Sequence, residues 1–284
     1  MITHHAAVFS IGPIELTGFG LAVAAAFWIA QHVTRTELAR RGDKRSAAAM
    51  SDLTLTAMLG TIVGAKLYYV VLITHDVRSV LERGGFVYWG GFIGAVLATA
   101  VFIRRRRLSF TAISDVAGIG IAAGYAIGRT GCWAVGDDYG RPWSSRWAVR
   151  FPEGAPASTA HNLRDVFHVP LPGISDGAVL GVYPTQLLEV VLGFAMFMIL
   201  WRFRRHGHAS GWLFGLYGLL AGSERFAVEF LRAKDDRVLI FGLSGAQGIA
   251  LTIAILGAGW MLMRRRSSDS PPEQQRDTAL LVGT

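Results

Sequence analysis

The sequence has a single cysteine among 284 residues, which excludes an internal disulfide and any metal site built from several cysteines. Its eight histidines show no metal-ligand spacing on a helix face, so we expect neither a metal nor another cofactor. Charged residues are also scarce, since they make up 17% of the chain while hydrophobic residues make up 52%. This balance excludes an ordinary soluble domain of this length and indicates an integral membrane protein.

Long hydrophobic runs recur along the chain, and each is close to the roughly 20 residues that a helix needs to cross a bilayer. They cover approximately residues 15–33, 53–74, 86–103, 110–128, 183–201, 211–231 and 245–263. No inverted repeat of the kind found in many transporters relates these runs to one another. We therefore predict an all-α fold, a polytopic bundle of about seven transmembrane helices that forms one domain over residues 1–266.

Basic residues predict how this bundle lies in the membrane. Clusters of Lys and Arg occur at residues 35–45, 104–107, 202–205 and 264–266. With about seven spans all four clusters fall on one side, which the bias of Lys and Arg toward inner loops identifies as the cytoplasm. We expect the N-terminus outside, the C-terminus inside, and residues 267–284 as a disordered cytoplasmic tail. The net charge of +8 follows from these clusters, and without a soluble basic domain nucleic acid is not an expected partner.

The longest connection between runs, about residues 129–182, is expected on the outer side. It is polar, rich in Gly and Pro, and carries aromatic side chains suited to the lipid headgroup level, namely Trp143, Trp147, Phe151 and Phe167. Near the opposite side, Asp115 lies close to the cytoplasmic start of the fourth run. There we expect its charge to complement the dipole of its own helix.

Ionisable residues within the runs gather toward the outer side. Arg129 follows Gly128 where the fourth run ends, and Glu189 lies about two turns into the fifth run. In the sixth run Arg225, Glu229 and Arg232 are spaced i, i+4 and i+7, so they share one helix face.

These charges have two interpretations. One is that they pair with one another and hold the helices together. The other is a functional site, which is the default for ionisable residues inside a membrane. Because the three arginines outnumber Glu189 and Glu229, we expect net positive charge at headgroup depth. Arginine binds phosphate oxygens through two parallel hydrogen bonds, so a lipid phosphate is the expected ligand.

The same charged residues lie in motifs that follow one another along the chain. The motifs occupy residues 20–21, 60–69, 90–94, 128–142, 151–152, 183–189 and 218–232. In this order, and on the same side of the membrane, they make the chain similar to the prolipoprotein diacylglyceryl transferase family of bacterial inner-membrane enzymes. The resemblance extends over most of the chain.

The resemblance implies a multi-pass enzyme at the outer face of the inner membrane. It would transfer the diacylglyceryl group from phosphatidylglycerol to the cysteine thiol of a prolipoprotein signal peptide, the first step of lipoprotein maturation, and release glycerol phosphate. Its partners would be phosphatidylglycerol, prolipoprotein signal peptides and the lipid bilayer. The residues implied for catalysis are Arg129, Arg225, Glu229 and Asp137. Those implied for binding phosphatidylglycerol are Arg129, Arg225, Arg232, Glu189, Gln186, Trp89, Gly90 and Gly91.

Four positions differ from the usual family pattern. Phe19 replaces Tyr, Trp89 replaces His, Cys132 replaces Asn, and Asp137 replaces Glu. Trp89 cannot act as a base, so Glu229, Asp137 or water would have to accept the thiol proton. We interpret Cys132 as a small replacement for Asn rather than as a nucleophile, because no histidine lies near it in the sequence.

Two alternatives to the transferase remain open at this point. The first is a divergent paralogue that keeps the lipid site but uses another acceptor, as the changes at Trp89, Cys132 and Phe19 suggest. The second is a non-catalytic protein that binds or transports phospholipid. Residues 190–200 and 212–220, in the inner halves of the fifth and sixth runs, are almost wholly apolar, which argues against a polar path through the membrane.

Overall fold

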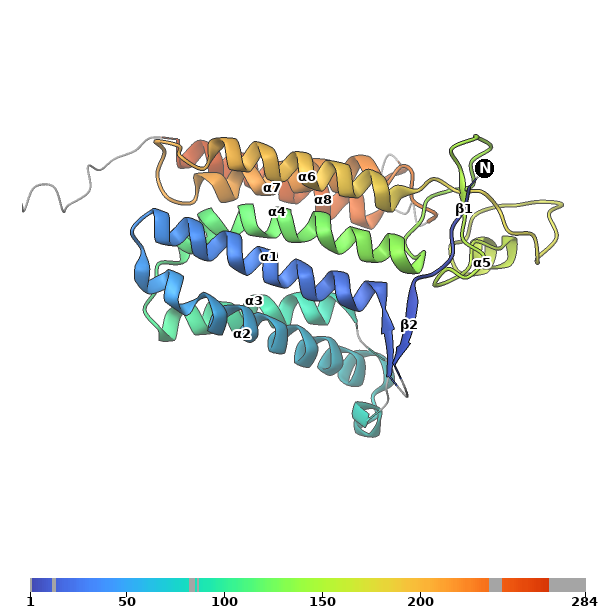
Figure 1. Cartoon of the computed structure of the whole chain (residues 1–284), viewed down its shortest axis with the longest axis horizontal. Helices are drawn as coiled ribbons and strands as arrows, with labels where there is room; N and C mark the ends of the chain where they lie inside the picture. Colours follow the sequence, from blue (N-terminus) through green and yellow to red (C-terminus); the bar gives the residue numbers. More distant parts are fainter. Residues whose placement is uncertain (1, 12–13, 82–84, 86, 235–241, 266–284) are drawn as a thin grey trace, which may run out of the picture.

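A computed structural model describes residues 2–11, 14–81, 85, 87–234 and 242–265, so the expected tail at residues 267–284 lies outside the described residues. Within these ranges, seven long helices run side by side along one axis (Figure 1). They are α1 (Gly18–Arg40), α2 (Lys44–Tyr68), α3 (Tyr88–Arg105), α4 (Phe110–Val135), α6 (Thr185–Phe203), α7 (Trp212–Val228) and α8 (Gly245–Met263). The prediction of an all-α membrane bundle is confirmed.

Four of these segments are long and apolar enough to cross a membrane by length and composition alone. They are Lys44–Thr74, Phe110–Val135, Thr185–Phe203 and Gly245–Met263; the first includes the π-helix η1 (Tyr69–Thr74) that continues α2. The total of seven spans and their orientation stay predictions. The helix ends nevertheless agree with that topology, since all four basic clusters fall at one end of the bundle as far as the structure describes them.

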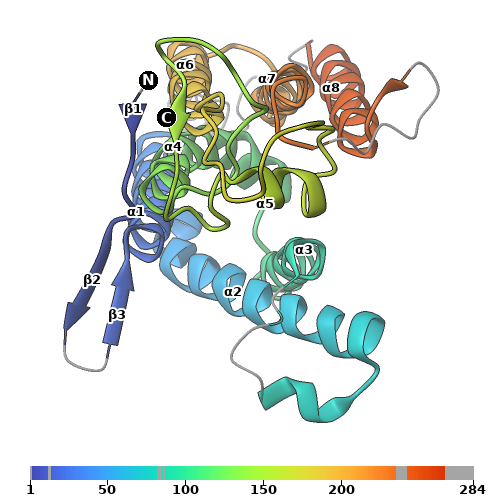
Figure 2. The same cartoon turned by 90° about the vertical axis from the view of Figure 1, so that its right-hand side faces the viewer.

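Glycine contacts bring neighbouring helices close together. A Cβ atom on Gly60 of α2 would lie 2.6 Å from the carbonyl oxygen of Gly94 in α3, and one on Gly64 would collide with the carbonyl of Gly90. Such small-residue contacts are a usual way of packing helices in membranes. Figure 2 shows the α2–α3 pair on one side of α1 and α4, with α6, α7 and α8 on the other. α4 therefore lies centrally and packs on α1, α6 and α7.

The basic end of the bundle holds a buried carboxylate with a structural role. Asp115 is fully buried and accepts hydrogen bonds from Arg41 Nη1 at 2.7 Å and from the backbone N–H of Leu213 at 2.7 Å. His206 Nε2 lies 2.9 Å from the same carboxylate. Leu213 is in the first turn of α7, so Asp115 caps the start of α7, whereas the sequence predicted that it complements its own helix.

The opposite end carries short strands and one small helix. Strand β1 (Ile2–Thr3) pairs in parallel with β4 (Val149–Arg150), and β2 (Val8–Ile11) forms a hairpin with β3 (Ile14–Thr17). Helix α5 (Ala160–Asp165) lies in the segment between α4 and α6, and the 3-10 helix η2 (Val77–Leu81) follows η1. Sequence reasoning missed these elements because each is too short to show a hydrophobic period.

The segment between α4 and α6 encloses a small hydrophobic core of its own. Phe151 is fully buried there, stacked on Tyr139 with ring centroids 5.5 Å apart, so it packs inside the protein and does not face lipid. The rings pack on each other because this segment is long enough to bury apolar area without help from the bilayer. Trp147 is exposed, as a headgroup-level residue would be.

Helix α4 extends past Arg129, the residue expected to end it. The helix stops at Val135 because Gly136 adopts φ 68°, the left-handed conformation that closes a helix. Gly131, inside the helix, instead allows close approach to α1, since a Cβ atom there would lie 2.7 Å from Ala22 Cβ. Arg129 is consequently held in a rigid helix rather than in a loop.

Candidate functional site

Arg129 lies among buried and half-buried charges at the end of the bundle opposite the basic clusters. Its Nη2 atom pairs with Glu189 of α6, and its Nη1 atom donates to Asp138 Oδ2 at 2.9 Å. Both carboxylates also face Arg232, whose Nη2 donates to Asp138 Oδ1 at 2.6 Å and whose Nη1 lies 3.9 Å from Glu189 Oε1. Glu189 is 1% exposed, and a carboxylate so deeply buried requires cationic partners of this kind.

Arg225 and Glu229 extend this group from α7. The Nη2 atom of Arg225 lies 2.6 Å from Glu229 Oε2, and the Nε atom of Arg232 lies 3.7 Å from the same oxygen. Glu229 Oε1 also accepts a hydrogen bond of 3.2 Å from Ser244, the N-cap residue of α8. We call Arg129, Arg225 and Arg232, together with Asp138, Glu189 and Glu229, the arginine cluster. It joins α4, α6 and α7 with the segments that follow α4 and α7.

The segment after α4 is fixed by the first turn of α6. Thr185 Oγ1 donates to the carbonyl oxygen of Asp138 at 2.7 Å, and Gln186 Nε2 donates to the carbonyl oxygen of Asp137 at 2.5 Å. Gln186 is fully buried, and its side-chain amide holds the backbone carbonyl of Asp137. Asp138 has φ 55°, a left-handed conformation that Asp tolerates better than most residues.

The two aspartates in this segment have opposite electrostatic environments. Burial alone would raise the pKa of Asp138, but the charges and hydrogen bonds of Arg232 and Arg129 lower it to about 2. Burial raises the pKa of Asp137, and this effect outweighs the hydrogen bond with Cys132 that lowers it. The Oδ1 atom of Asp137 is buried without a hydrogen-bond partner among the described residues. Asp138 is thus a firmly held anion, while Asp137 is the better proton acceptor.

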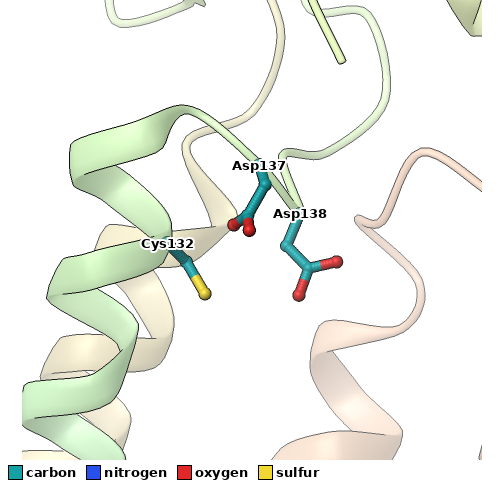
Figure 3. Close-up of side chains that lie close together, drawn as sticks. All are labelled: Cys132, Asp137 and Asp138. Atoms are coloured by element: carbon teal, nitrogen blue, oxygen red, sulfur yellow. The ribbon is translucent and has the colours of Figure 1, made fainter. Parts of the chain in front are cut away.

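Cys132, Asp137 and Asp138 lie close together where α4 ends (Figure 3), with one ligand atom from each within 4.8 Å of the others. A cation bound there would compete with two guanidinium groups already paired with Asp138. The Asp138 carboxylate is therefore better described as an anion held by two arginines than as a ligand of a metal ion. The Cys132 sulfur itself accepts from Arg129 Nη1 at 3.3 Å.

Tyr125 and Glu224 are members of this site that sequence reasoning missed. The Tyr125 hydroxyl donates to Glu224 Oε1 at 3.0 Å and lies 3.4 Å from Glu189 Oε1. The available signals were the spacing of four residues between Tyr125 and Arg129 and the adjacency of Glu224 to Arg225.

Asp138 and Glu224 also change the expected charge balance. The sequence predicted three arginines facing two acids, and hence a net positive site. In the described structure Asp138 and Glu224 join Glu189 and Glu229, so the acids are no fewer than the arginines. The prediction of excess positive charge is therefore wrong, because Asp138 lies in a turn and Glu224 next to Arg225, outside the spacing that was considered.

Trp89, Gly90 and Gly91 lie elsewhere, in the first turn of α3 against α2. A Cβ atom on Gly90 would collide with the carbonyl of Gly64, and one on Gly91 would lie 3.1 Å from Thr61 Cγ2. Trp89 is 44% exposed. The two glycines thus serve the contact between α2 and α3, and the described residues of the arginine cluster come from other helices.

Two guanidinium nitrogens in the arginine cluster remain available to a ligand. Within the described part of the chain, Arg129 Nε and Arg225 Nη1 are buried without a hydrogen-bond partner. A buried donor left unpaired costs about 1–3 kcal/mol, so an acceptor-rich ligand that reached both would bind favourably. The Arg225 side chain as a whole is 33% exposed.

Comparison with known proteins identifies the family of the chain. A family model described as prolipoprotein diacylglyceryl transferase matches residues 6–263. The chain is 32% identical to a Burkholderia mallei protein named phosphatidylglycerol–prolipoprotein diacylglyceryl transferase, over 90% of this chain and 93% of that protein. A Burkholderia thailandensis protein of the same name matches with the same identity and coverage. The chain belongs to the prolipoprotein diacylglyceryl transferase family.

Proposed function

We propose that this protein transfers the diacylglyceryl group of phosphatidylglycerol to the cysteine thiol of a prolipoprotein signal peptide. The related proteins are named for that reaction, and the chain matches them over nearly its whole length. The observation that carries the proposal is the arginine cluster, where donors from α4 and α7 converge with unpaired nitrogens on Arg129 and Arg225.

The phosphate of the lipid would bind to Arg129, Arg225 and Arg232. Phosphate oxygens accept hydrogen bonds from guanidinium forks, and the free Nε of Arg129 and Nη1 of Arg225 supply donors that the protein leaves unused in its described part. Glu189 and Glu229 hold these arginines in place, since each acid contacts two of them. For Gln186 we propose a supporting role, because its buried amide fixes the segment that carries Asp137.

An apolar groove next to the cluster suits an acyl chain of the same lipid. Its volume is about 330 Å³, and it is lined by Trp143, Tyr183, Pro184, Thr185, Leu187, Leu188, Val191 and Leu231. Leu231 precedes Arg232, and Thr185 holds the carbonyl of Asp138, so the groove and the cluster share one wall. A lipid with its phosphate at the arginines could place one chain in this groove.

The chemistry is a displacement at the glyceryl carbon. The thiol sulfur forms a bond to that carbon, the bond between the carbon and the phosphate oxygen breaks, and glycerol phosphate leaves with the electron pair. The arginines stabilise the negative charge that grows on the leaving phosphate. We propose that Asp137 accepts the thiol proton, since its pKa is raised and one of its oxygens is unpaired in the described structure. Glu229 orients Arg225 and Arg232.

The remaining residues and the location of the enzyme complete the proposal. Trp89 would contribute to lipid binding from the α2–α3 side, where it is exposed, and Gly90 and Gly91 would support it by keeping α3 close to α2. The bundle would lie in the bacterial inner membrane with the arginine cluster at the outer face and the basic clusters in the cytoplasm. Residues 1–266 would form the membrane domain.

Mass spectrometry of a model prolipoprotein tests this function. The chain is expressed in a host depleted of its own transferase, and the signal-peptide cysteine should gain the mass of a diacylglyceryl group. An Arg129→Ala chain, inserted in the membrane to the same level, should give no gain. An unmodified prolipoprotein with the intact chain would instead favour a divergent relative that uses another acceptor, or a phospholipid-binding protein without this activity.

A further inference from the structure

The anion position between Arg129 and Arg232 is already filled by a side chain of this protein. Asp138 gives one carboxylate oxygen to each arginine, Oδ2 to Arg129 at 2.9 Å and Oδ1 to Arg232 at 2.6 Å. A phosphodiester bridges two guanidinium groups in the same way, with one oxygen on each. The carboxylate and the phosphodiester also carry the same charge.

Asp138 differs from the other acids of the cluster in its accessibility. Its side chain is 39% exposed, whereas those of Glu189 and Glu229 are 2% and 4% exposed. Arg129 and Arg232 behind it are 12% and 17% exposed. Asp138 is therefore the acid that covers the arginines from the open side, and a ligand that approaches them meets it first.

The backbone that carries Asp138 is anchored independently of its side chain. The Asp138 carbonyl is held by Thr185, and the preceding carbonyl by Gln186. Rotation of the side chain away from the arginines breaks none of these hydrogen bonds. The carboxylate can leave while the segment stays in place.

We propose that the Asp138 carboxylate is a stand-in for the substrate phosphate, which occupies the position between Arg129 and Arg232 until phosphatidylglycerol displaces it. The identity of the incoming anion rests on the proposed function. One anion of charge −1 replaces another, so the buried arginines stay neutralised in both states. After the reaction the product is a phosphate monoester with a charge of about −1.5 to −2, which arginines bind more firmly. The returning carboxylate then competes with this product and favours its release.

The test compares Asp138→Asn with wild type and with Asp176→Asn as a matched control. Asp176 also forms a 2.6 Å pair with an arginine, Arg164, in the segment between α4 and α6, outside the arginine cluster. The dissociation constant of glycerol phosphate is measured by calorimetry on the full chain in a phosphate-free maltoside detergent. In vesicles, the KM for phosphatidylglycerol and the inhibition constant of glycerol phosphate are measured by lipid transfer.

Asp138→Asn should bind glycerol phosphate at least about tenfold more tightly, a change of about 1.4 kcal/mol, with a lower KM and stronger product inhibition. Asp176→Asn should match wild type in each measurement. If a folded Asp138→Asn chain binds glycerol phosphate equally or more weakly, the proposal is overturned, because the carboxylate would then be needed to hold the arginines in place.

A second variant and a second readout keep the test decisive. If Asp138→Asn fails to fold, Asp138→Ser replaces it, and failure of both to fold also refutes the stand-in. Tighter glycerol phosphate binding without any lipid transfer by wild type would retain the stand-in and reject the transferase. If Asp138→Asn binds glycerol phosphate more tightly but has an unchanged KM for phosphatidylglycerol, only the free phosphate ester displaces the Asp138 carboxylate. That result would reject the lipid headgroup as the displacing anion.

Discussion

Replacing Arg225 by lysine tests whether the planar fork of this residue binds the phosphate. One nitrogen, Nη2, lies 2.6 Å from Glu229, and the other, Nη1, is buried without a hydrogen-bond partner in the part of the chain that the structure describes. A lysine has one nitrogen on a flexible stem, so it can pair with Glu229 or reach the phosphate from that side, but it does not reproduce both geometries. The loss is therefore one preorganised donor to the developing charge.

Loss of one such donor costs about 2.7–4 kcal/mol of transition-state stabilisation, or roughly 10²–10³ in kcat. Stability should change little, because lysine keeps a positive charge beside the buried Glu229, so that carboxylate is not left without a cation. The assay is lipid transfer to a synthetic lipobox peptide from phosphatidylglycerol vesicles, with the thermal midpoint of the purified chain measured alongside.

Arg164→Lys is the matched control for this variant. Arg164 also pairs with an acid at 2.6 Å, and its side chain is 32% exposed against 33% for Arg225. It should retain wild-type transfer. If Arg225→Lys keeps kcat within about threefold of wild type, a change of less than about 1 kcal/mol, the second nitrogen does not bind the phosphate and the reasoning is refuted.

Three further predictions concern other parts of the molecule. Arg129→Ala should abolish transfer while Cys132→Ser leaves it largely intact; an inactive serine variant with normal expression would make the thiol essential. Asp115→Ala should lower the free energy of unfolding by about 3–5 kcal/mol, since it takes a fully buried acid away from Arg41 and the buried His206 side chain and leaves the backbone N–H of Leu213 unpaired. The transfer rate of this variant, divided by the amount of folded protein, should equal that of wild type. Because burial raises the pKa of Asp137, this base should become protonated, and transfer should fall, at a higher pH than that at which an ordinary aspartate titrates. Asp137→Asn should lack this acid limb in a pH–rate profile, and an unchanged limb would exclude Asp137 as the base.

Much of the fold could be predicted because a membrane helix needs a long apolar run, and such runs are visible in the sequence. The last run at residues 245–263 coincides with α8. Helix ends were harder to predict, since they depend on backbone conformation. The fourth run was expected to end at Arg129, yet α4 continues to Val135 and is closed by Gly136, which has a positive φ.

Some contacts of the site could be predicted from the spacing of residues along a helix, whereas others depend on the tertiary fold. Arg225 and Glu229 are four residues apart on one helix, so their pairing could be predicted. The hydrogen bond that Arg232 donates to Asp138 joins residues 94 apart through a turn, and no local pattern predicts it. Asp115 is the converse case, since its helix position was clear but its partner, the start of α7, was not.

The separation along the chain of the partners of Arg129 has a consequence for synthesis. Glu189 follows Arg129 by 60 residues, and at about 5–20 residues per second the ribosome needs roughly 3–12 seconds to make that stretch. Asp138 follows by 9 residues and is made within about two seconds of Arg129. Of the two acids that pair with Arg129, Asp138 is thus made first and can neutralise its charge before α6 and α7 exist.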